Sequence, residues 1–462
     1  MASPLLLCIV LCSYYSIAHG RGNDSFVTMP TSAFEPEQVC SGERVTLEQN
    51  HCAVSLPLVH RHGPCAPSPS TDKPSFSDTL RRSRARVNHI TARVAARSVG
   101  SHGDETVGIP AHLGSYVDSL EYVVTVSFGT PAVPRVVIID TGSDLSWLQC
   151  KPCASGECSL QKDPLFDPTN SSTYASIPCA SDACKKLEAD AYSIGCAKGG
   201  KQCGFNIMYA DFTMTDGVYS KDKLTLAPGV TVNNFYFGCG HDERTAGGLY
   251  DGLLGLGLMS ESLAVQLGGG GATSYCLPAV SSKAGFLALG AGKNTDGFQL
   301  TPMGRVPGEP TFATVTLTGI SVGGKKLSLL PSAFEGGMIV DSGSALTALQ
   351  TTAYKALRSA FREAMAAYPR LPNPNHYVDT CYNFTGHKNV VVPKIALTFT
   401  GGATINLDVP NGILVDDCLA FVDSGLLPGH STAGILGNVN QRTFEVLFDT
   451  SSNKVGFRGN AC

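Results

Sequence analysis

The chain has 462 residues, of which 43% are hydrophobic and 16% are charged; it contains 50 glycines and carries a net charge of −4. A chain of this length can form two domains with full cores. Its composition excludes a disordered or coiled-coil protein and is typical of a turn-rich, mostly β protein. The slightly acidic charge balance gives no support to nucleic-acid binding.

The extreme N-terminus carries a short apolar segment, residues 4–18, with the small residues Ala18 and Gly20 at its end. Such a segment is too short to span a bilayer and is typical of a signal peptide. We therefore predict a signal peptide at residues 1–20 and a protein secreted to the extracellular space, with the vacuole as the alternative destination. Because no later apolar run is long enough for a membrane helix, we expect no membrane span.

Residues 21–107 differ in composition from the rest of the chain. They contain proline-rich stretches and a basic run, Arg81 to Arg97, with six arginines and no acidic residue. This segment fits an inhibitory prosegment that is removed by a cut between residues 98 and 115. The alternative interpretation is a solvated charged helix without a role at an active site.

From Tyr116 onward, short apolar or β-branched runs alternate with turn residues, a pattern typical of an all-β architecture. The clearest predicted strands are residues 121–128, 135–139, 205–209, 218–226 and 234–237. One helix is predicted at Thr352–Tyr368, because apolar residues recur there at helical spacing and Pro369 follows.

Two similar turns lie in the two halves of the chain. The apolar run 136–139 ends at Asp140, and the run 338–340 ends at Asp341. A carboxylate at the end of a buried strand needs hydrogen bonds to offset its desolvation, and a following glycine N–H and nearby hydroxyls can supply them. The two turns therefore predict two carboxylates brought face to face. Their supporting residues are Thr141, Gly142, Ser143, Ser342, Gly343 and Ser344.

Twelve cysteines follow residue 107, an even number that favours disulfides in a secreted protein. They are Cys150, Cys153, Cys158, Cys179, Cys184, Cys196, Cys203, Cys239, Cys276, Cys381, Cys418 and Cys462. A zinc site in the cluster at residues 150–203 is the alternative, but no histidine is interleaved there at ligand spacing. Asn170 and Asn383 each begin an Asn-x-Ser/Thr triplet, so N-glycosylation is expected at both.

At its two aspartate turns the chain resembles the pepsin-like aspartic proteases, in which each lobe contributes one Asp-Thr/Ser-Gly turn. The stretch Asp-Thr-Gly-Ser-Asp-Leu-Ser-Trp-Leu-Gln-Cys, residues 140–150, is similar to the plant nepenthesin-type branch. The resemblance covers residues 120–462 and implies an all-β, bilobal fold with a few short helices. It implies an N-terminal lobe at residues 108–305, with a cysteine-rich insert and a flap, and a C-terminal lobe at residues 306–462.

Both halves also carry an apolar-apolar-Gly segment, at residues 251–257 and 433–438, which supports an internal duplication. In the family this segment crosses beneath the catalytic turn of its own lobe. The resemblance further implies that Tyr209 is the tyrosine of a β-hairpin flap over the cleft and that Trp147 supports it. A plain core role for Trp147 is the alternative. The chain departs from the family pattern after Tyr209, where the flap tip has a bulky Phe212.

The resemblance also implies how the cysteines pair. The implied disulfides are Cys150–Cys153, Cys158–Cys239, Cys179–Cys203, Cys184–Cys196, Cys276–Cys462 and Cys381–Cys418.

The implied activity is peptide hydrolysis by a water held between Asp140 and Asp341. Because like charges repel in a poorly solvated cleft, the two carboxyl groups are expected to share one proton. The ionised group takes a proton from the water, and the protonated group donates to the scissile carbonyl. No cofactor or metal is implied. The expected partners are polypeptide substrates and the chain's own prosegment, and the protein is expected to be a monomer.

We hypothesise that the arginine run covers this acidic cleft at neutral pH, through Arg81, Arg82, Arg84 and Arg86, and leaves it in acid. The protein would then be made as a zymogen and be active at acidic pH. One alternative is a catalytically inactive pepsin-like binding protein or inhibitor, which would usually lack an aspartate or its glycine. Another is a disulfide-rich lectin or structural module, which leaves the paired turns unexplained.

Overall fold

The structure is a computed structural model. It describes residues 25–34, 39–42, 54–61, 63–67, 86, 87, 90, 122–153, 158, 161, 163–190, 192–197, 200–208, 214–244, 250–268, 272–279, 283–291, 295–306, 308–372, 378–426 and 433–462. The predicted signal peptide lies outside these residues. Within them, no helix is both long and apolar enough to cross a membrane.

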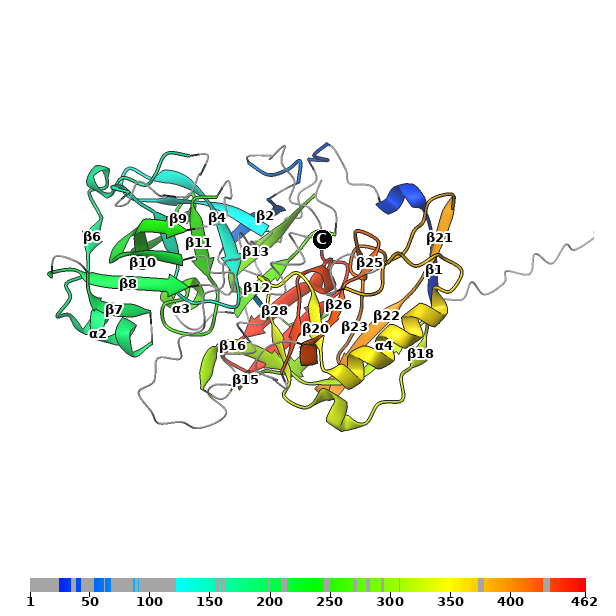
Figure 1. Ribbon diagram of the computed structural model, residues 1–462. Helices are drawn as coiled ribbons and strands as arrows, with labels where there is room; N and C mark the ends of the chain where they lie inside the picture. The colour runs from blue at the N-terminus through cyan, green and yellow to red at the C-terminus, as the bar shows by residue number, and fades with distance from the viewer. Residues whose placement is uncertain are drawn as a thin grey trace, which may run out of the picture.

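The fold is all-β and bilobal, as expected. Figure 1 shows one lobe built from the cyan and green part of the chain and a second built from the yellow to red part, with one large sheet extending through both. The strands of that sheet are β2 (Val54–His60), β3 (Tyr122–Phe128), β4 (Val133–Asp140), β5 (Trp147–Gln149), β6 (Ala175–Ser176), β7 (Ser193–Cys196), β8 (Cys203–Met208), β9 (Met214–Ala227), β10 (Val230–Arg244), β11 (Gly252–Gly255), β12 (Ala272–Cys276), β13 (Ala284–Ala291), β14 (Gln299–Pro302), β28 (Glu445–Asp449) and β29 (Lys454–Arg458).

The second lobe adds smaller sheets. Its strands are β15 (Gly304–Val306), β16 (Glu309–Val315), β19 (Met338–Val340), β20 (Thr347–Leu349), β26 (Phe421–Asp423) and β27 (Gly434–Leu436) in one sheet; β17 (Leu317–Val322), β18 (Lys325–Lys326), β22 (Ile395–Phe399) and β23 (Thr404–Asn406) in another; and the pairs β24 (Leu414–Val415) with β25 (Cys418–Leu419) and β1 (Phe26–Pro30) with β21 (Asn389–Pro393).

In the residues that the structure describes, helices are few and short. They are α2 (Asp182–Ala189), α3 (Leu263–Gln266) and α4 (Thr351–Ala364), with 3-10 turns η1 (Thr31–Phe34), η3 (Pro168–Asn170), η4 (Pro331–Phe334), η5 (Thr400–Gly402), η6 (Ser424–Leu426) and η7 (Val439–Gln441).

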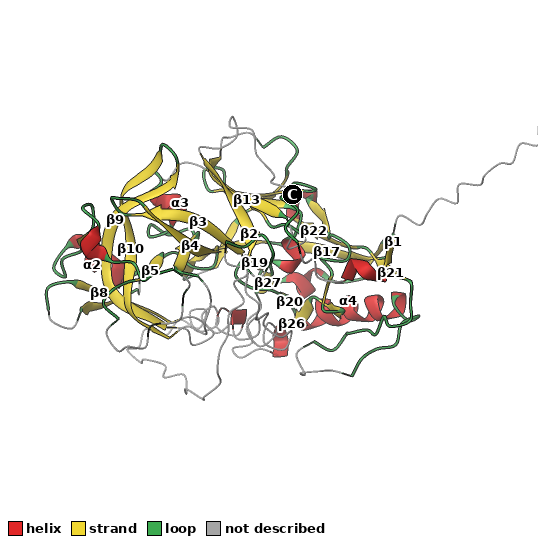
Figure 2. Cartoon of the chain, turned by 90° about the horizontal axis from the view of Figure 1, so that it is seen from above, coloured by secondary structure: helices red, strands yellow, loops and turns green. Residues whose placement is uncertain are grey.

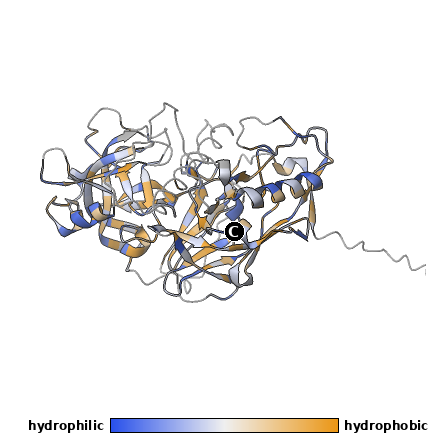
Figure 3. Cartoon of the chain, turned by 60° about the horizontal axis from the view of Figure 1, so that its bottom comes forward, coloured by the Kyte–Doolittle hydropathy of each residue, from blue (hydrophilic) through white to orange (hydrophobic). Residues whose placement is uncertain are grey.

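The predicted strands that the structure describes are present. Strand β4 is buried over its last six residues, because its apolar run lies between β3 and β11 in the sheet. Burial on both faces explains why this run has no polar alternation. Figure 3 shows hydrophobic residues concentrated in the strands of both lobes and hydrophilic residues along the outer helix α4. Strand β8 ends at Met208. The last residue of the predicted strand 205–209 lies outside the described residues.

Helix α4 packs on the outer side of the second lobe, as Figure 2 shows. It buries Tyr354, Leu357 and Phe361, as its periodicity predicts. It ends at Ala364, however, four residues before the predicted end. Met365 and Tyr368 are still buried, so the apolar spacing continues into a turn that packs on the same core. Pro369 disfavours a helical backbone only at Tyr368, so it limits the turn that follows the helix and does not account for the end at Ala364.

Strand β2 comes from the predicted prosegment but lies inside the large sheet. It pairs with β13 along residues 54–59 and with β3 at residues 59 and 60, antiparallel in both cases. Leu56 and Leu58 are fully or almost fully buried. This part of the N-terminal segment is therefore integrated into the core.

The twelve cysteines after residue 107 all form disulfides, which excludes the zinc alternative. Two of the pairs implied by the resemblance, Cys276–Cys462 and Cys381–Cys418, are present. The other four implied pairings are wrong. The structure instead joins Cys150–Cys239, Cys153–Cys158, Cys179–Cys196 and Cys184–Cys203, and it adds Cys40–Cys65.

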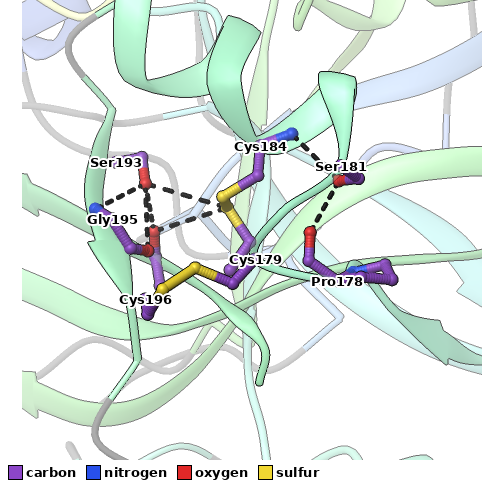
Figure 4. Close-up of a disulfide and its surroundings, with 9 residues drawn as sticks. Pro178, Cys179, Ser181, Cys184, Ser193, Gly195 and Cys196 are labelled. Carbon is purple, nitrogen blue, oxygen red and sulfur yellow. Dashed lines mark hydrogen bonds between the residues drawn. A yellow bond between two sulfur atoms is a disulfide. The ribbon is translucent and has the colours of Figure 1, made fainter. Parts of the chain in front are cut away.

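Strand pairing and burial explain the corrected partners. Strands β5 and β10 are parallel neighbours, and the Cys150 N–H donates to the Gly240 carbonyl at 2.8 Å, which brings Cys150 beside Cys239. In the insert, helix α2 turns Cys184 inward toward Cys203, and both are buried. The partner disulfide, Cys179–Cys196, lies nearer the surface. Figure 4 shows it below the start of α2, where the Ser181 hydroxyl caps the Cys184 N–H at 3.2 Å.

The buried insert disulfide is expected to contribute most to the stability of the first lobe. Replacing both Cys184 and Cys203 by Ser should lower the free energy of unfolding by about 2–4 kcal/mol. The matched control replaces Cys153 and Cys158, whose loop is only a few residues long and should contribute less. Chemical denaturation measures both, and peptide mapping of the native protein tests the pairing. Recovery of Cys179–Cys203 peptides would contradict it.

Candidate active site

The two predicted aspartates lie at equivalent places in the two lobes. Asp140 is the last residue of β4, and Asp341 directly follows β19. Each strand has a parallel neighbour, β11 for β4 and β27 for β19. Both aspartates have 0% of their surface exposed. Burial of two carboxylates is costly unless each receives hydrogen bonds.

Each turn supplies those hydrogen bonds in the same way. In the first turn the Gly142 N–H donates to Asp140 Oδ1 at 2.9 Å, and the Ser143 hydroxyl donates to Oδ2 at 2.6 Å. In the second turn the Gly343 N–H and the Ser344 hydroxyl donate to Asp341 Oδ1 and Oδ2 at 2.9 Å and 2.6 Å. The predicted supporting residues therefore orient both carboxylates.

The two turns also bind each other directly. The Thr141 N–H donates to the Ser342 hydroxyl at 3.1 Å, and the Ser342 N–H donates to the Thr141 hydroxyl at 2.9 Å. The Thr141 hydroxyl in turn donates to the Val340 carbonyl at 3.2 Å. These reciprocal bonds tie the two lobes together at the base of the site and fix the spacing of the two aspartates.

The apolar-apolar-Gly segments pass directly beneath the turns, as the sequence predicts. The Leu256 N–H donates to the Asp140 carbonyl at 2.8 Å, and the Asp341 N–H donates to the Leu436 carbonyl at 3.2 Å. A Cβ on Gly255 would lie 2.1 Å from the Asp144 carbonyl oxygen, and a Cβ on Gly437 would lie 2.5 Å from the Leu346 backbone. Glycine is therefore required for this close passage.

A guanidinium occupies the space between the two carboxylates. Arg86 Nη2 lies 2.5 Å from Asp140 Oδ1 and 2.8 Å from Asp341 Oδ1, and Arg86 Nε lies 2.7 Å from Asp341 Oδ2. Because one nitrogen contacts both Oδ1 atoms, those oxygens lie no further apart than the sum of the first two distances. The aspartates are therefore face to face, and a residue of the N-terminal basic run bridges them.

The guanidinium of Arg86 is stabilised in its charged form. Burial alone would lower the pKa of the guanidinium, but its attraction to Asp140 and Asp341 and its hydrogen bonds to both raise that pKa well above the ordinary value. Its neighbours Val87 and Ile90 are buried in the same cluster as Phe312 and Val378 of the second lobe. The segment around Arg86 therefore binds through both charge and apolar contact.

The remaining predicted residues have mixed outcomes. Trp147 is 2% exposed in the core of the first lobe, beside Phe205 and Ile207 of β8. Its predicted support of the flap stays a prediction, because Tyr209 lies outside the described residues, as do Arg81, Arg82 and Arg84. Asn170 and Asn383 are both exposed, as N-glycosylation requires.

The sequence analysis missed Asp144, a fully buried carboxylate that follows the first turn. It accepts hydrogen bonds from the Met259 N–H at 2.9 Å and from the Tyr192 and Thr311 hydroxyls at 3.1 Å and 2.7 Å. Thr311 belongs to β16, so Asp144 is a second link between the lobes. Its only signal in the sequence is a second acid just after the first turn.

A buried tyrosine and glutamine also support the second aspartate from below. Gln441 donates from its side-chain nitrogen to the Asp341 carbonyl at 3.2 Å and to the Leu436 carbonyl at 2.7 Å, and it accepts from the Tyr275 hydroxyl at 2.5 Å. Nothing in the sequence pattern marked either residue, because Tyr275 lies on strand β12 and Gln441 in the 3-10 turn η7, and these two elements meet only in the fold.

This geometry, two strand-ending aspartates held face to face by Gly N–H and hydroxyl donors from two similar lobes, defines a pepsin-like aspartic protease. Family models described as "Xylanase inhibitor N-terminal" and "Xylanase inhibitor C-terminal" match residues 122–291 and 314–459. The chain belongs to the plant pepsin-like aspartic proteases and is an aspartic-type endopeptidase.

Several similar proteins support this assignment. Aspartyl protease AED1 from Arabidopsis thaliana is 35% identical over 456 residues, covering 96% of this chain and 93% of that protein. Aspartic proteinase nepenthesin-2 from Nepenthes gracilis is 32% identical over 486 residues, covering 100% and 99%. The crystal structure of Basic 7S globulin from soybean matches with a TM-score of 0.57 at 19% identity, over 73% of this chain and 90% of that one, which shows the fold alone.

The hydroxyl of Thr141 is expected to be essential for the spacing of the aspartates. Thr141→Val leaves the buried Ser342 N–H without an acceptor, which should cost about 1–3 kcal/mol of stability. Displacement of one carboxylate should lower kcat by up to about 10²-fold. Thr141→Ser keeps the hydroxyl and is the control. Thermal unfolding and steady-state kinetics measure both, and equal behaviour of the two variants would refute the role.

Asp251, at the start of the segment beneath the first turn, is a buried carboxyl with an unusual pKa. It accepts from the Val136 N–H at 2.9 Å and is 2% exposed. Burial raises its pKa from 3.8 to about 6, although the Val136 hydrogen bond and the charge of Arg135 lower it. The folded state therefore binds this proton more tightly than the unfolded chain does.

Linkage then predicts that Asp251 makes the protein more stable in acid. Its contribution is fully present below pH 3.8 and is lost as the pH rises through about 6. A shift of this size corresponds to roughly 3 kcal/mol. Asp251→Asn keeps an acceptor for Val136 but cannot titrate, so its unfolding free energy should vary less between these two pH values. Denaturant titrations at both ends of the range test this, and an unchanged pH profile would contradict it.

Proposed function

We propose that this endopeptidase is secreted as a zymogen, is kept latent by Arg86 and becomes active at acidic pH. Asp140 and Asp341 are the catalytic residues in this proposal, and residues 21–107 are the inhibitory prosegment. The single observation that carries it is the bridge that Arg86 forms between the two carboxylates. The localisation rests on the N-terminal apolar segment and the disulfides, and the apoplast and the vacuole are both compatible with it.

The chemistry follows from the geometry of the two turns. With the cleft open, a water between the two inner oxygens would replace the guanidinium and contact both carboxyl groups. One ionised carboxyl takes a proton from that water as it attacks the scissile carbonyl, and the other, protonated, donates to the carbonyl oxygen. The Gly142 and Gly343 N–H groups already donate to the Oδ1 atoms of the two aspartates, so they stabilise negative charge on these carboxyl groups without reorganisation.

Arg86 prevents this chemistry in two ways. Its nitrogens occupy the place where the water and the scissile carbonyl must bind. Its charge also pairs with both carboxylates, so these ion pairs must be broken before the carboxylates can act on a water or a substrate. A buried arginine that makes three charge-assisted hydrogen bonds is a strong competitor for the site.

Acid releases this lock by acting on the carboxylates, because the guanidinium stays charged at every working pH. Protonation of the aspartates removes the attraction and leaves a charged group in a desolvated site, which is unfavourable. The segment would then leave the cleft and expose the catalytic pair. Val87 and Ile90 oppose this release through their apolar contacts, so departure from the cleft and loss of their burial should occur together.

The latency role of Arg86 is tested with an active-site probe. Arg86→Ala removes hydrogen bonds worth about 1.5–3 kcal/mol each, so full-length protein should bind a pepstatin probe at pH 7 at least about tenfold more tightly than the unaltered chain. Arg86→Lys keeps the charge but not the planar fork and should be intermediate. The control is Arg61→Ala, which removes another arginine of the same segment. Arg61 packs over the Tyr250 ring, so the control removes a contact different from that of Arg86 with the aspartates. Equal probe binding by all four proteins would refute the lock.

The assignment of the catalytic pair has a separate test. Digestion of denatured globin should rise as the pH falls and should be abolished by pepstatin, by Asp140→Asn and by Asp341→Asn. Because a single catalytic residue can account for several orders of magnitude of rate, residual activity should be below about 10⁻³ of the original. Cleavage that persists in either variant would overturn the mechanism.

The inactive alternative is disfavoured by the same residues. Both turns keep the aspartate, its glycine and its hydroxyl donors in identical hydrogen-bonding arrangements. The relatives at 32–35% identity are named proteases.

A further inference from the structure

We propose that the second lobe carries a second polypeptide-binding site, away from the catalytic cleft, at the edge of strand β21. Its occupant is residues 25–34 of this same chain, which we name the N-terminal arm. Figure 1 and Figure 2 both show β1 beside β21 at one end of the molecule, beyond β22 and far from β4. This inference deepens the proposed function, because the arm belongs to the predicted prosegment.

The arm binds first through its backbone. Residues 26–30 pair antiparallel with residues 389–393, in continuous register. The ladder extends at both ends, where the Lys394 N–H donates to the Ser25 carbonyl at 2.9 Å and the Thr31 N–H donates to the Lys388 carbonyl at 3.2 Å. In the described part of the chain, β1 is the only strand partner of β21. An extended segment that adds to a free strand edge is a common mode of peptide recognition.

The pattern of hydrogen bonds explains the composition of the arm. In an antiparallel ladder, residue pairs that exchange backbone hydrogen bonds alternate with pairs that do not. Ser25 and Thr31 both belong to hydrogen-bonded pairs, with residues 394 and 388. Val27 and Met29 therefore also belong to hydrogen-bonded pairs, and Pro30 belongs to a pair without hydrogen bonds. The missing N–H of Pro30 therefore costs nothing. The Val391 N–H points the opposite way and donates to the Tyr368 hydroxyl at 2.7 Å.

Side chains give the site its specificity for an apolar segment. Val27 and Met29 lie opposite Val392 and Val390, both of which are fully buried, whereas Thr28 is exposed opposite the exposed Val391. At the far end of the arm, the Phe34 ring packs against Phe384, with ring centroids 5.1 Å apart. One face of the arm therefore completes the apolar surface of the second lobe.

Two glycines shape the other end of the site. They form the hairpin tip between β17 and β18, and both have positive φ, 55° at Gly323 and 75° at Gly324. A Cβ on Gly323 would lie 3.0 Å from the Phe26 ring, and a Cβ on Gly324 would lie 2.1 Å from the Ser25 hydroxyl. The tip therefore has room for the arm only because it lacks side chains.

A covalent link connects this site to the rest of the prosegment. The disulfide Cys40–Cys65 joins the stretch after the arm to the stretch after β2, which lies in the large sheet. The prosegment is thus held at three separate places: at β21, in the large sheet and, through Arg86, in the cleft. Because linked contacts raise one another's effective concentration, a prosegment cut only between residues 98 and 115 should stay bound and reclose the cleft at neutral pH.

The test uses the intact chain and needs no cleavage. The arm proposal can therefore fail while the zymogen proposal stands, and the zymogen proposal can fail while the arm proposal stands. Val27→Asp places a charge on the inward face of the arm and should raise amide hydrogen exchange at Val390 and Val392 by about tenfold or more. The matched control, Thr28→Asp on the outward face, should change it by less than about twofold. Exchange at Gly142 and Gly343 in the cleft should not change in either variant.

A peptide then tests whether the site binds in trans. Synthetic peptide of residues 25–34, added to the Val27→Asp chain, should restore protection at Val390 and Val392, and the same peptide carrying Val27→Asp should not. The milder Val27→Ser replaces the variant if Val27→Asp does not fold. Equal exchange in the inward and outward variants, simultaneous opening of the cleft, or failure of the peptide to restore protection would each overturn the proposal.

Discussion

The structure depends on one reciprocal contact, in which the Thr141 and Ser342 backbones and hydroxyls bind each other across the two lobes. Each catalytic-type turn alone is a local motif that any strand end could carry. Their mutual hydrogen bonds hold two buried carboxylates, which repel each other, at a fixed distance. Asp144 and Gln441 extend this constraint on either side, since Asp144 accepts from Thr311 and Gln441 supports the Asp341 backbone.

Electrostatics explains why the site is occupied by a basic side chain. Two desolvated carboxylates without a shared proton need a cation, and Arg86 supplies one with a planar group that contacts both. In the proposed zymogen, the oxygens that catalysis would use are the ones that Arg86 binds. Under that proposal, catalysis and latency exclude each other.

The N-terminal segment forms part of the folded molecule at three distant places. It contributes a central strand to the large sheet, an arm to the edge of the second lobe and a cation to the cleft. Through these contacts the segment is a structural partner of both lobes. In the proposed zymogen, the loss of any one contact would leave the other two, so the segment would resist partial opening.

The sequence by itself determined the elements whose signals are local: the buried strands, the two aspartate turns with their glycine and hydroxyl donors, and the start of the helix after Asp341. Tertiary structure decided the rest. The spacing of the cysteines along the chain allows several pairings. The pairing in the insert depends on which cysteines are buried together, as Cys184 and Cys203 are. The sequence marked a whole basic run as a cover for the cleft, but only the fold shows Arg86 bridging the carboxylates. The arm on β21 had no local signal, because strand pairing joins residues some 360 positions apart through hydrogen bonds that any backbone can form.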